Sequence, residues 1–420
     1  MNTYPNMATV TQQFPRPTVG ALDEAVHAAL AGAFPSGERF FGKRIAVAVG
    51  SRGITGIAAI TKTVVAFLRD HGAHPFLIPA MGSHGGGAEE GQRKLLAEYG
   101  VTPEAIGVPL DTDLTTVCLG ETPEGFPVYF SRVAMESDGV LLINRVKPHT
   151  DFRGEVESGL CKMITIGLGK IDGANAMHSR ITHWNHDQII LPITRLALQT
   201  APIVGGLAVV ENAYHETALV EFVLPANFEE RDKALLAQAR TLMPSLPVEQ
   251  ADVLLIDQIG KNISGAGMDP NIAGRWFRIN SIWQDKPNFT RICVLGLTAE
   301  TEGNAVGIGL ADFCNRRVVD AMDRDITYLN AVISRNTVNA HLPMVFDTDR
   351  AMMAMVTQSM GAGITPETMR IVRIPNTLDI TRIQVSEPLI DELKIHPQVA
   401  SISVPEAMVF DAMGNLPFLQ

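Results

Sequence analysis

Cysteine is scarce in this chain, and its spacing excludes two kinds of scaffold. The 420 residues include four cysteines, Cys118, Cys161, Cys293 and Cys314, and no Cys-x-x-Cys pair. Neither a zinc ribbon nor a disulfide framework is therefore expected. Long apolar runs are also lacking, since no segment approaches the roughly 20 residues of a membrane span and the N-terminus has no signal-peptide core. We expect a cytoplasmic protein.

Excess positive charge is lacking as well. The chain has 34 basic and 45 acidic residues, and its formal net charge is −11. Nucleic acids and anionic membranes attract basic surfaces, so neither is expected as a partner. Any anionic ligand must therefore be held by a local basic pocket.

Strands followed by glycine-rich turns open the chain. Residues 44–50, RIAVAVG, predict a strand, GSRGITG predicts a turn, and the helical spacing of apolar residues over 57–71 predicts a helix that ends at Gly72. The strand PFLIPA (75–80) likewise ends in GSHGGG and leads into a helix over 88–100. Such units build parallel sheets, whose ligands bind at the loops after the strands.

The length of the chain favours two domains. The proline-containing segment PSLPVEQ (244–250) is the best linker, and a second strand and loop pattern begins at ADVLLIDQIG. We predict two α/β domains with a cleft between them. Residues 1–245 form a cofactor-binding and catalytic domain, and residues 248–395 a domain that contributes substrate contacts. The tail, 396–420, is expected to return to the first domain if it joins either.

Two histidines follow predicted strands. His84 stands in Gly-Ser-His-Gly-Gly-Gly, and His149 follows the strand DGVLLINRV and Pro148. Each alone is as compatible with a structural role as with a catalytic one. Together they suit a reaction that needs a proton acceptor on either side of a carbon, of which racemisation is the simplest.

Basic residues are locally concentrated between positions 138 and 170. The five are Arg145, Lys147, Arg153, Lys162 and Lys170. With Arg52 they predict a pocket for phosphate or carboxylate, although we expect Lys170 and Arg153 to be solvated surface charges. Lys162 borders the apolar run MITIGLG, so it is either a partly dehydrated lysine with a lowered pKa or a snorkelling one.

Two other patterns carry less weight. GLGKIDG resembles a dinucleotide fingerprint, but its third glycine is displaced by one position. His178, His183 and His186 are spaced such that a regular helix would not bring all three together, so a three-histidine zinc site is not expected.

Taken together, these residues resemble the nickel-dependent lactate racemase family. The resemblance rests on Arg52 in the turn after the first strand, Gly-Ser-His at His84, Pro-His at His149, Gly-x-x-Lys at Lys162 and Asn-x-x-His at His178. It covers about residues 40 to 215, and the rest of the chain only in general architecture.

The resemblance implies a lactate racemase-like fold and a specific cofactor. This is a nickel-pincer nucleotide, nickel pyridinium-3-thioamide-5-thiocarboxylic acid mononucleotide, which would be tethered to Lys162 and contacted by Arg52 and Ser51. His178 would complete the coordination of nickel. His84 and His149 would act as alternating acid and base groups while hydride leaves a 2-hydroxy acid and returns to either face. Soft sulfur and imidazole donors suit nickel.

Departures from the family pattern point away from lactate as the substrate. Val49-Gly50-Ser51-Arg52 replaces Asp-x-Thr-Arg, Gly85 replaces an arginine, and the loop 150–161 is longer. The Tyr-Gln-x-x-Lys signature is absent. In its place the loop GKNISGAGMDPNIAGR provides candidate substrate contacts, which are Lys261, Asn262, Ser264 and Arg275.

We therefore predict an isomerase, a racemase or epimerase of a 2-hydroxy acid other than lactate. Its expected partners are that substrate and the cofactor-biosynthesis proteins that load the enzyme, and a homo-oligomer is left open. One alternative is a cofactor-free binding protein for an anionic metabolite. A weaker alternative is a nicotinamide-dependent oxidoreductase.

Overall fold

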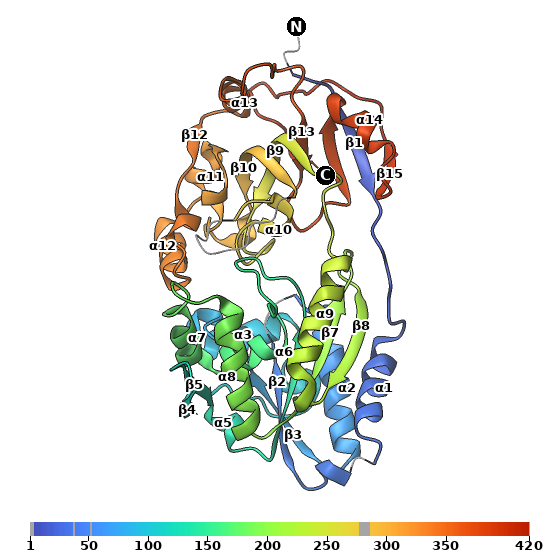
Figure 1. Cartoon of the computed structure of the whole chain (residues 1–420), viewed down its shortest axis with the longest axis vertical. Coiled ribbons are helices and arrows are strands. Elements are labelled where there is room, and N and C mark those ends of the chain that lie inside the picture. Colours follow the sequence, from blue (N-terminus) through green and yellow to red (C-terminus); the bar gives the residue numbers. More distant parts are fainter. Residues whose placement is uncertain (1–3, 37, 51–52, 277–285, 420) are drawn as a thin grey trace. The chain divides into compact units, whose positions relative to one another are not determined.

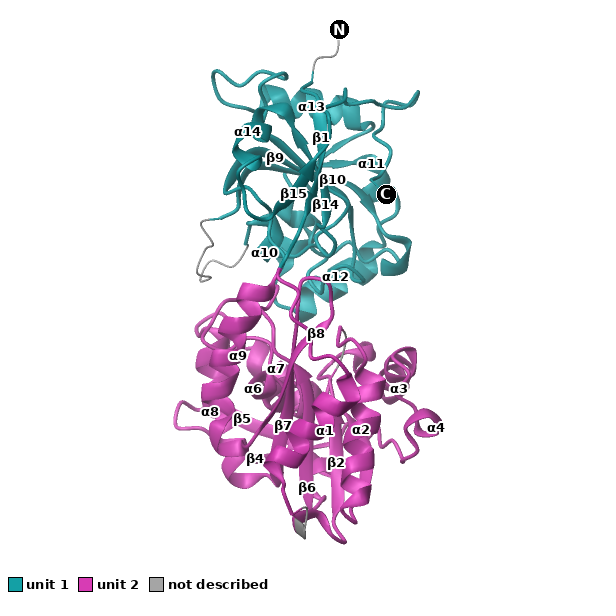
Figure 2. Ribbon diagram, turned by 90° about the vertical axis from the view of Figure 1, so that its right-hand side faces the viewer, with its two compact units in different colours: residues 1–14, 244–420 teal, residues 15–243 magenta. Residues whose placement is uncertain are grey.

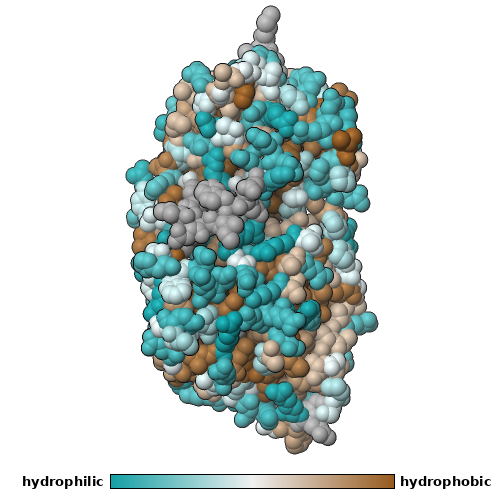
Figure 3. All heavy atoms as spheres, viewed as in Figure 1, coloured by the Kyte–Doolittle hydropathy of each residue, from teal (hydrophilic) through white to brown (hydrophobic). Residues whose placement is uncertain are grey.

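The computed structural model describes residues 4–36, 38–50, 53–276 and 286–419, which fold into two units. Unit 1 consists of residues 1–14 and 244–420, and unit 2 of residues 15–243 (Figures 1 and 2). On the face drawn in Figure 3, hydrophilic side chains are interspersed with hydrophobic ones. Within the described ranges, no helix is long and apolar enough to cross a membrane.

Unit 2 is built on a five-stranded sheet in the order β3-β2-β6-β7-β8. The strands are β2 (Arg44–Val49), β3 (His74–Pro79), β6 (Gly139–Arg145), β7 (Ile203–Glu211) and β8 (Thr217–Val223). β3, β2, β6 and β7 run parallel, and β8 pairs antiparallel with β7. Parallel strands are covered on both faces, which explains their unbroken apolar runs.

Helices cover both faces of this sheet. Ile45, Val47 and Val49 of β2 pack with α1 (Leu22–Ala33) and α2 (Ile57–Asp70), whereas Ala46 and Ala48 face α8 (His186–Thr200) and α9 (Phe228–Leu242). The alternation follows from the two-residue period of a strand. The remaining elements of the unit are α3 (Glu89–Glu98), α4 (Pro103–Ile106), the hairpin β4 (Thr116–Glu121) and β5 (Pro127–Ser131), α5 (Arg132–Met135), α6 (Leu160–Lys162), the π-helix η3 (Met163–Leu168), α7 (Lys170–His178) and the short 3-10 turns η1 (Glu38–Phe40), η2 (Gly85–Gly87) and η4 (Pro225–Asn227).

Unit 1 contains an eight-stranded mixed sheet in the order β12-β11-β10-β9-β13-β14-β1-β15. The strands are β1 (Met7–Gln12), β9 (Gln250–Ile259), β10 (Asn288–Leu297), β11 (Phe313–Asn315), β12 (Met344–Phe346), β13 (Ile371–Ile374), β14 (Arg382–Ser386) and β15 (Val399–Ile402). Its α-helices are α10 (Pro270–Ala273), α11 (Arg316–Asp320), α12 (Arg324–Ile333), α13 (Asp349–Gln358) and α14 (Ile390–Leu393). The mixed α/β class predicted from the sequence is confirmed.

The two chain ends lie in unit 1, which differs from the predicted domain limits. β1 pairs with both β14 and β15, so the first fourteen residues leave the predicted 1–245 domain. The tail, 396–420, also lies in unit 1 rather than returning to the first domain. The sequence did not indicate this because strand pairing across almost the whole chain leaves no local pattern. The break between the units, Met243 to Pro244, falls at the start of the predicted linker.

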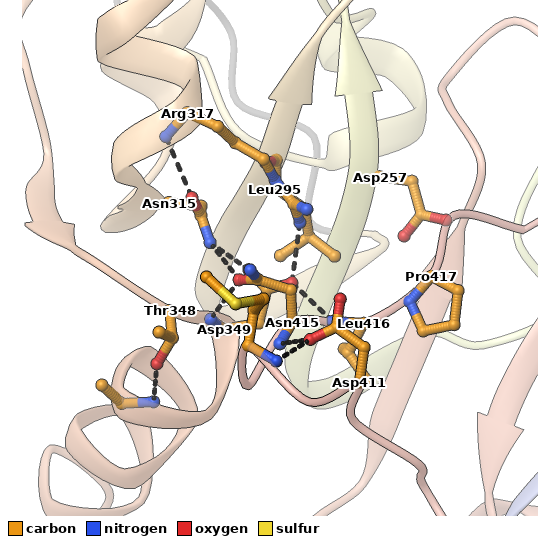
Figure 4. A network of polar contacts seen from close by, with 12 residues as sticks. Asp257, Leu295, Asn315, Arg317, Thr348, Asp349, Asp411, Asn415, Leu416 and Pro417 are labelled. Carbon is orange, nitrogen blue, oxygen red and sulfur yellow. Dashed lines mark hydrogen bonds and ion pairs between the residues drawn. The ribbon is translucent and has the colours of Figure 1, made fainter.

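A buried polar network anchors the tail (Figure 4). The Asp349 carboxylate is fully buried and accepts from Asn315 Nδ2 at 2.7 Å, from Arg317 Nη2 at 2.7 Å and from the backbone N–H of Leu416 at 2.8 Å. Asn415 Oδ1 accepts from Asn315 Nδ2 at 3.0 Å. A buried carboxylate is stable only when hydrogen bonds satisfy its oxygens. The tail supplies one of these bonds to Asp349 through the N–H of Leu416.

A second buried pair, Arg373 and Asp257, gives a stability prediction. Arg373 Nε donates to Asp257 Oδ1 at 2.7 Å, and both side chains are buried. Arg373→Met should leave the Asp257 carboxylate without its counter-charge and lower the free energy of unfolding by about 3 to 5 kcal/mol. Urea denaturation measures this. Lys394→Met, which removes an exposed lysine paired with Asp391, is the control and should leave the midpoint unchanged; an equal effect of both variants would contradict the prediction.

Candidate active site

The loops after β2, β3 and β6 bring the predicted reactive residues to one edge of the sheet in unit 2. Because these strands are parallel, their carboxyl ends meet at the same edge. His84 follows β3 and His149 follows β6. Ser51 and Arg52, in the loop after β2, lie outside the described residues.

His84 is exposed at the start of the turn η2, in a loop that glycine makes possible. Gly85 has a φ of +67°, and a Cβ there would lie 2.5 Å from the backbone carbon of Gly91. The side chain of Gln92, which is fully buried, donates to the carbonyl oxygens of Gly82 at 2.9 Å and His84 at 3.3 Å. The backbone of His84 is therefore held while its ring faces solvent.

His149 is held through both its backbone and its ring. Its backbone N–H donates to Glu157 Oε2 at 2.5 Å, and its Nδ1 accepts from the backbone N–H of Asp151 at 3.0 Å. Because Nδ1 is an acceptor, the neutral ring carries its proton on Nε2. Nε2 is then the atom that can give a proton to a bound oxygen. The ring stacks on Phe152 with 4.3 Å between the centroids.

Glu157 organises the loop that carries His149. Its carboxylate is buried, accepts from the backbone N–H of Gly154 at 3.3 Å and pairs with Arg240 Nη2 of α9 at 2.6 Å. Arg153 Nη1 lies 3.7 Å from the same carboxylate, and only 12% of its side chain is exposed. The expectation that Arg153 is a solvated charge is therefore wrong.

Lys162 lies in α6, beside the aromatic ring that packs on His149. Its Nζ is 5.6 Å from the centre of the Phe152 ring. Burial lowers the pKa of Lys162 from 10.5 to about 8, although the Asp151 and Glu157 carboxylates oppose this shift. Within the described residues its amine makes neither an ion pair nor a hydrogen bond, and the residue keeps some contact with solvent. The dehydrated-lysine interpretation thus agrees with its surroundings.

Lys170 differs from its predicted surface role. It is fully buried, and its Nζ donates to the carbonyl oxygen of Pro79, the last residue of β3, at 2.6 Å. Burial lowers its pKa to about 8, opposed by Asp113, Asp111 and Glu89. The sequence does not predict this bond, because its acceptor lies on β3, about ninety positions earlier in the chain.

The histidines after Lys170 are separated by the ends of two helices. His178 is the last residue of α7 and partly buried, His183 is exposed in the following turn, and His186 begins α8 and stacks on Phe152 at 3.8 Å. Among the described residues, no group of three His, Cys, Asp or Glu side chains could hold a metal ion. His178 remains a predicted ligand of nickel, without a second protein ligand predicted beside it. The fingerprint-like segment GLGKIDG lies within η3 and α7, so it forms no strand-to-helix turn.

The four predicted substrate contacts belong to unit 1, and each has a partner there. Lys261 Nζ donates to the carbonyl oxygen of Gly265 at 2.5 Å, and Asn262 Oδ1 accepts from Thr298 Oγ1 at 2.6 Å. Ser264 is buried, and its Oγ accepts from the backbone N–H of Ala266 at 3.3 Å. Arg275 pairs with Asp312 at 2.6 Å and donates to the carbonyl oxygen of Leu310 at 3.0 Å. These bonds stabilise the loop itself. The guanidinium of Arg275 in particular is held by Asp312 and the Leu310 carbonyl.

Several supporting residues were missed from the sequence: Gln92, Phe152, Glu157, Asp232 and Arg240. One signal was available. Asp232 shares the apolar stripe of α9 with Phe228, Leu235 and Leu236, and a carboxylate on a buried stripe needs a polar partner. Glu157 and Phe152 carry no such signal, because the loop around them has no period.

Comparisons with known proteins relate part of this chain to one family. A family model described as the lactate racemase N-terminal domain matches residues 22–188, a segment that includes His84, His149, Lys162 and His178. The solved structure of the lactate racemase apoprotein from Thermoanaerobacterium thermosaccharolyticum is similar, with a TM-score of 0.52 and 14% sequence identity. The alignment covers 88% of this chain and 94% of that chain, and at this identity it shows the fold alone. No curated protein sequence matches the chain.

The role of Glu157 can be tested without any ligand. Glu157→Ala should leave the N–H groups of His149 and Gly154 without their acceptor, so the amides of 147–159 should exchange hydrogen about tenfold faster or more. Exchange in β7 should not change. Glu155→Ala removes the more exposed carboxylate that pairs with Lys233 in the same loop and is the matched control. Unchanged exchange in Glu157→Ala would show that other contacts hold the loop.

Proposed function

We propose that this chain, a member of the lactate racemase family through its residues 22–188, inverts the C2 carbon of a 2-hydroxy acid other than lactate. The family supports a racemase or epimerase in general terms. The finer assignment depends on one observation, which is that the matched segment contains His84, His149, Lys162 and His178. Phe152 contacts both the ring of His149 and the amine of Lys162, which supports a shared task.

Lys162 and His178 are suited to the nickel-pincer nucleotide. An amine with a pKa of about 8 is partly neutral near neutral pH, and one without an ion pair or hydrogen bond among the described residues is available for a covalent tether. The imidazole of His178 is a donor that nickel accepts. Lys162 would therefore hold the cofactor and His178 would bind its metal. When bound, the cofactor supplies the acceptor, and later the donor, of the hydride at C2.

The two histidines would move the hydroxyl proton. Because Nδ1 accepts from Asp151, the neutral ring of His149 would carry its proton on Nε2 and could return it to the substrate oxygen. His84, exposed in the loop after β3, is the complementary acceptor. Reaction from the opposite enantiomer exchanges these roles. The transient 2-keto acid can then receive hydride on either face, which inverts the centre.

The substrate is proposed to be larger or more polar than lactate. Support comes from the sequence departures, which are the loss of the Tyr-Gln-x-x-Lys signature and the replacement of an arginine by Gly85. Lys261 stays a proposed substrate contact, because its ammonium group can pair with a carboxylate.

Covalent loading tests the cofactor assignment. Protein produced together with the cofactor-making enzymes should carry an adduct of the nucleotide and nickel, seen by intact mass and metal analysis. Lys162→Ala should abolish the adduct, since no other amine replaces the tether. Lys94→Ala, on the exposed part of α3, is the control and should load normally. Tight binding of an anionic metabolite without nickel would favour the binding-protein alternative. A rise in melting temperature with NAD or NADP would favour the oxidoreductase alternative.

Substitution of either histidine tests the proton transfers. His84→Asn and His149→Asn should each lower the rate of inversion by about 10²- to 10⁴-fold, because each removes a general acid or base. Loaded protein is offered a panel of enantiopure 2-hydroxy acids with hydroxyl, carboxyl or aryl groups at C3, and chiral chromatography follows inversion. His183→Asn, an exposed turn residue, is the control. Normal inversion by both site variants would contradict the mechanism.

A further inference from the structure

Asp232, a buried carboxylate on α9, lies at the start of the helical segment that carries Lys162. Its Oδ1 accepts from the backbone N–H of Leu160 at 3.1 Å, and its Oδ2 from that of Cys161 at 2.8 Å. These are the first two residues of α6, and the first N–H groups of a helix have no partner within it. The cap is thus supplied by a residue about seventy positions further along the chain.

The site is shaped for this carboxylate. At Gly159, which precedes α6, a Cβ would lie 2.7 Å from both oxygens of Asp232. Any other residue at this position would push the carboxylate away. Gly159 and Asp232 are therefore a matched pair.

The peptide group before Lys162 is clamped from its other side as well. The carbonyl oxygen of Cys161 accepts from Thr165 Oγ1 at 3.1 Å and from Thr194 Oγ1 of α8 at 3.1 Å. Asp232 accepts from the N–H of Cys161, so side chains bind both the backbone N–H and the backbone carbonyl of this residue. Lys162 is the next residue, so the origin of its side chain has little freedom.

We infer that Asp232 is a positioning residue for Lys162: by fixing the first turn of α6, it holds the lysine amine in its dehydrated place beside Phe152. The use of the amine as a tether rests on the proposed function, whereas its position does not. Asp232 touches neither substrate nor cofactor in this role.

The effect acts through position and not through charge. The carboxylates that act on Lys162 are those of Asp151 and Glu157, and both favour its charged form. Loss of the Asp232 charge alone should therefore not change the pKa of Lys162. Loss of the anchor should let water reach the amine and raise its pKa toward 10.5, the ordinary value.

Competitive labelling of lysines in the full-length protein without cofactor tests this. The protein is acetylated at a series of pH values, and peptide masses give the midpoint for Lys162 and the extent of labelling at Lys170. Asp232→Asn keeps the shape but turns one acceptor into a donor, so the Lys162 midpoint should rise by about one pH unit or more. Lys170 is fully buried and donates to the Pro79 carbonyl, so it should stay unlabelled, and its acetylation in a variant would show unfolding in place of a local effect.

Matched variants complete the test. Gly159→Ala should reproduce the shift by displacing the carboxylate, and Glu230→Gln, which removes an exposed carboxylate of the same helix, should not. An unchanged Lys162 midpoint in both Asp232→Asn and Gly159→Ala would overturn the inference. If neither variant folds, the unsubstituted protein still decides. A Lys162 midpoint near 10.5, or Leu160 and Cys161 amides that exchange as fast as in an unfolded chain, would overturn it too.

Loading separates this inference from the proposed function. With the cofactor-making enzymes present, Asp232→Asn should carry a smaller fraction of adduct than the unsubstituted protein. No adduct on the unsubstituted protein would refute the proposed function, while labelling would still decide the position of Lys162. Equal loading with equal midpoints would refute only the role of Asp232.

Discussion

Backbone groups at the carboxyl edge of the unit 2 sheet must find hydrogen-bond partners away from water, and the candidate site depends on the side chains that supply them. Gln92 holds the loop of His84, Glu157 holds the N–H of His149, and Asp232 holds the helix start before Lys162. An unsatisfied buried N–H or C=O costs about 1 to 3 kcal/mol, so each loop has a strong reason to keep one conformation. The reactive groups inherit their positions from these bonds.

Helix α9 is the common support of the loop that departs most from the family pattern. Asp232, Lys233 and Arg240 reach the segment 154–161 at Leu160 and Cys161, at Glu155, and at Glu157. A longer loop has more conformations to lose on folding, and contacts along one rigid helix offset that entropy. The longer loop is therefore held at both ends, next to His149 and next to Lys162.

The sequence predicted the parts of the structure that follow local rules. The apolar runs of β2, β3 and β6 were readable, as were the glycine turns and helices after β2 and β3, and with them the edge where His84 and His149 lie. Helices α6 and α7, which follow β6, were not predicted. The pairing of β1 with β14 and β15 was not, because it joins residues more than 370 positions apart. Lys170 and Arg153 were misjudged for a related reason: the side chain's destination lies on another element, and composition describes only its neighbours.

Lys162 and Lys170 show why a lowered pKa does not by itself identify a tether. Both pKa values fall to about 8 through burial, and the two residues lie eight positions apart on one helical segment. Lys170 is sealed from solvent and its amine donates to the carbonyl of Pro79, so it links α7 to the end of β3. Lys162 keeps contact with solvent, and its amine faces the Phe152 ring instead of an oxygen. A lysine that is dehydrated yet uncommitted and reachable can form a new bond, whereas one committed to a backbone oxygen stabilises the fold. This difference in partners, and not the shared burial, favours Lys162 as the reactive residue.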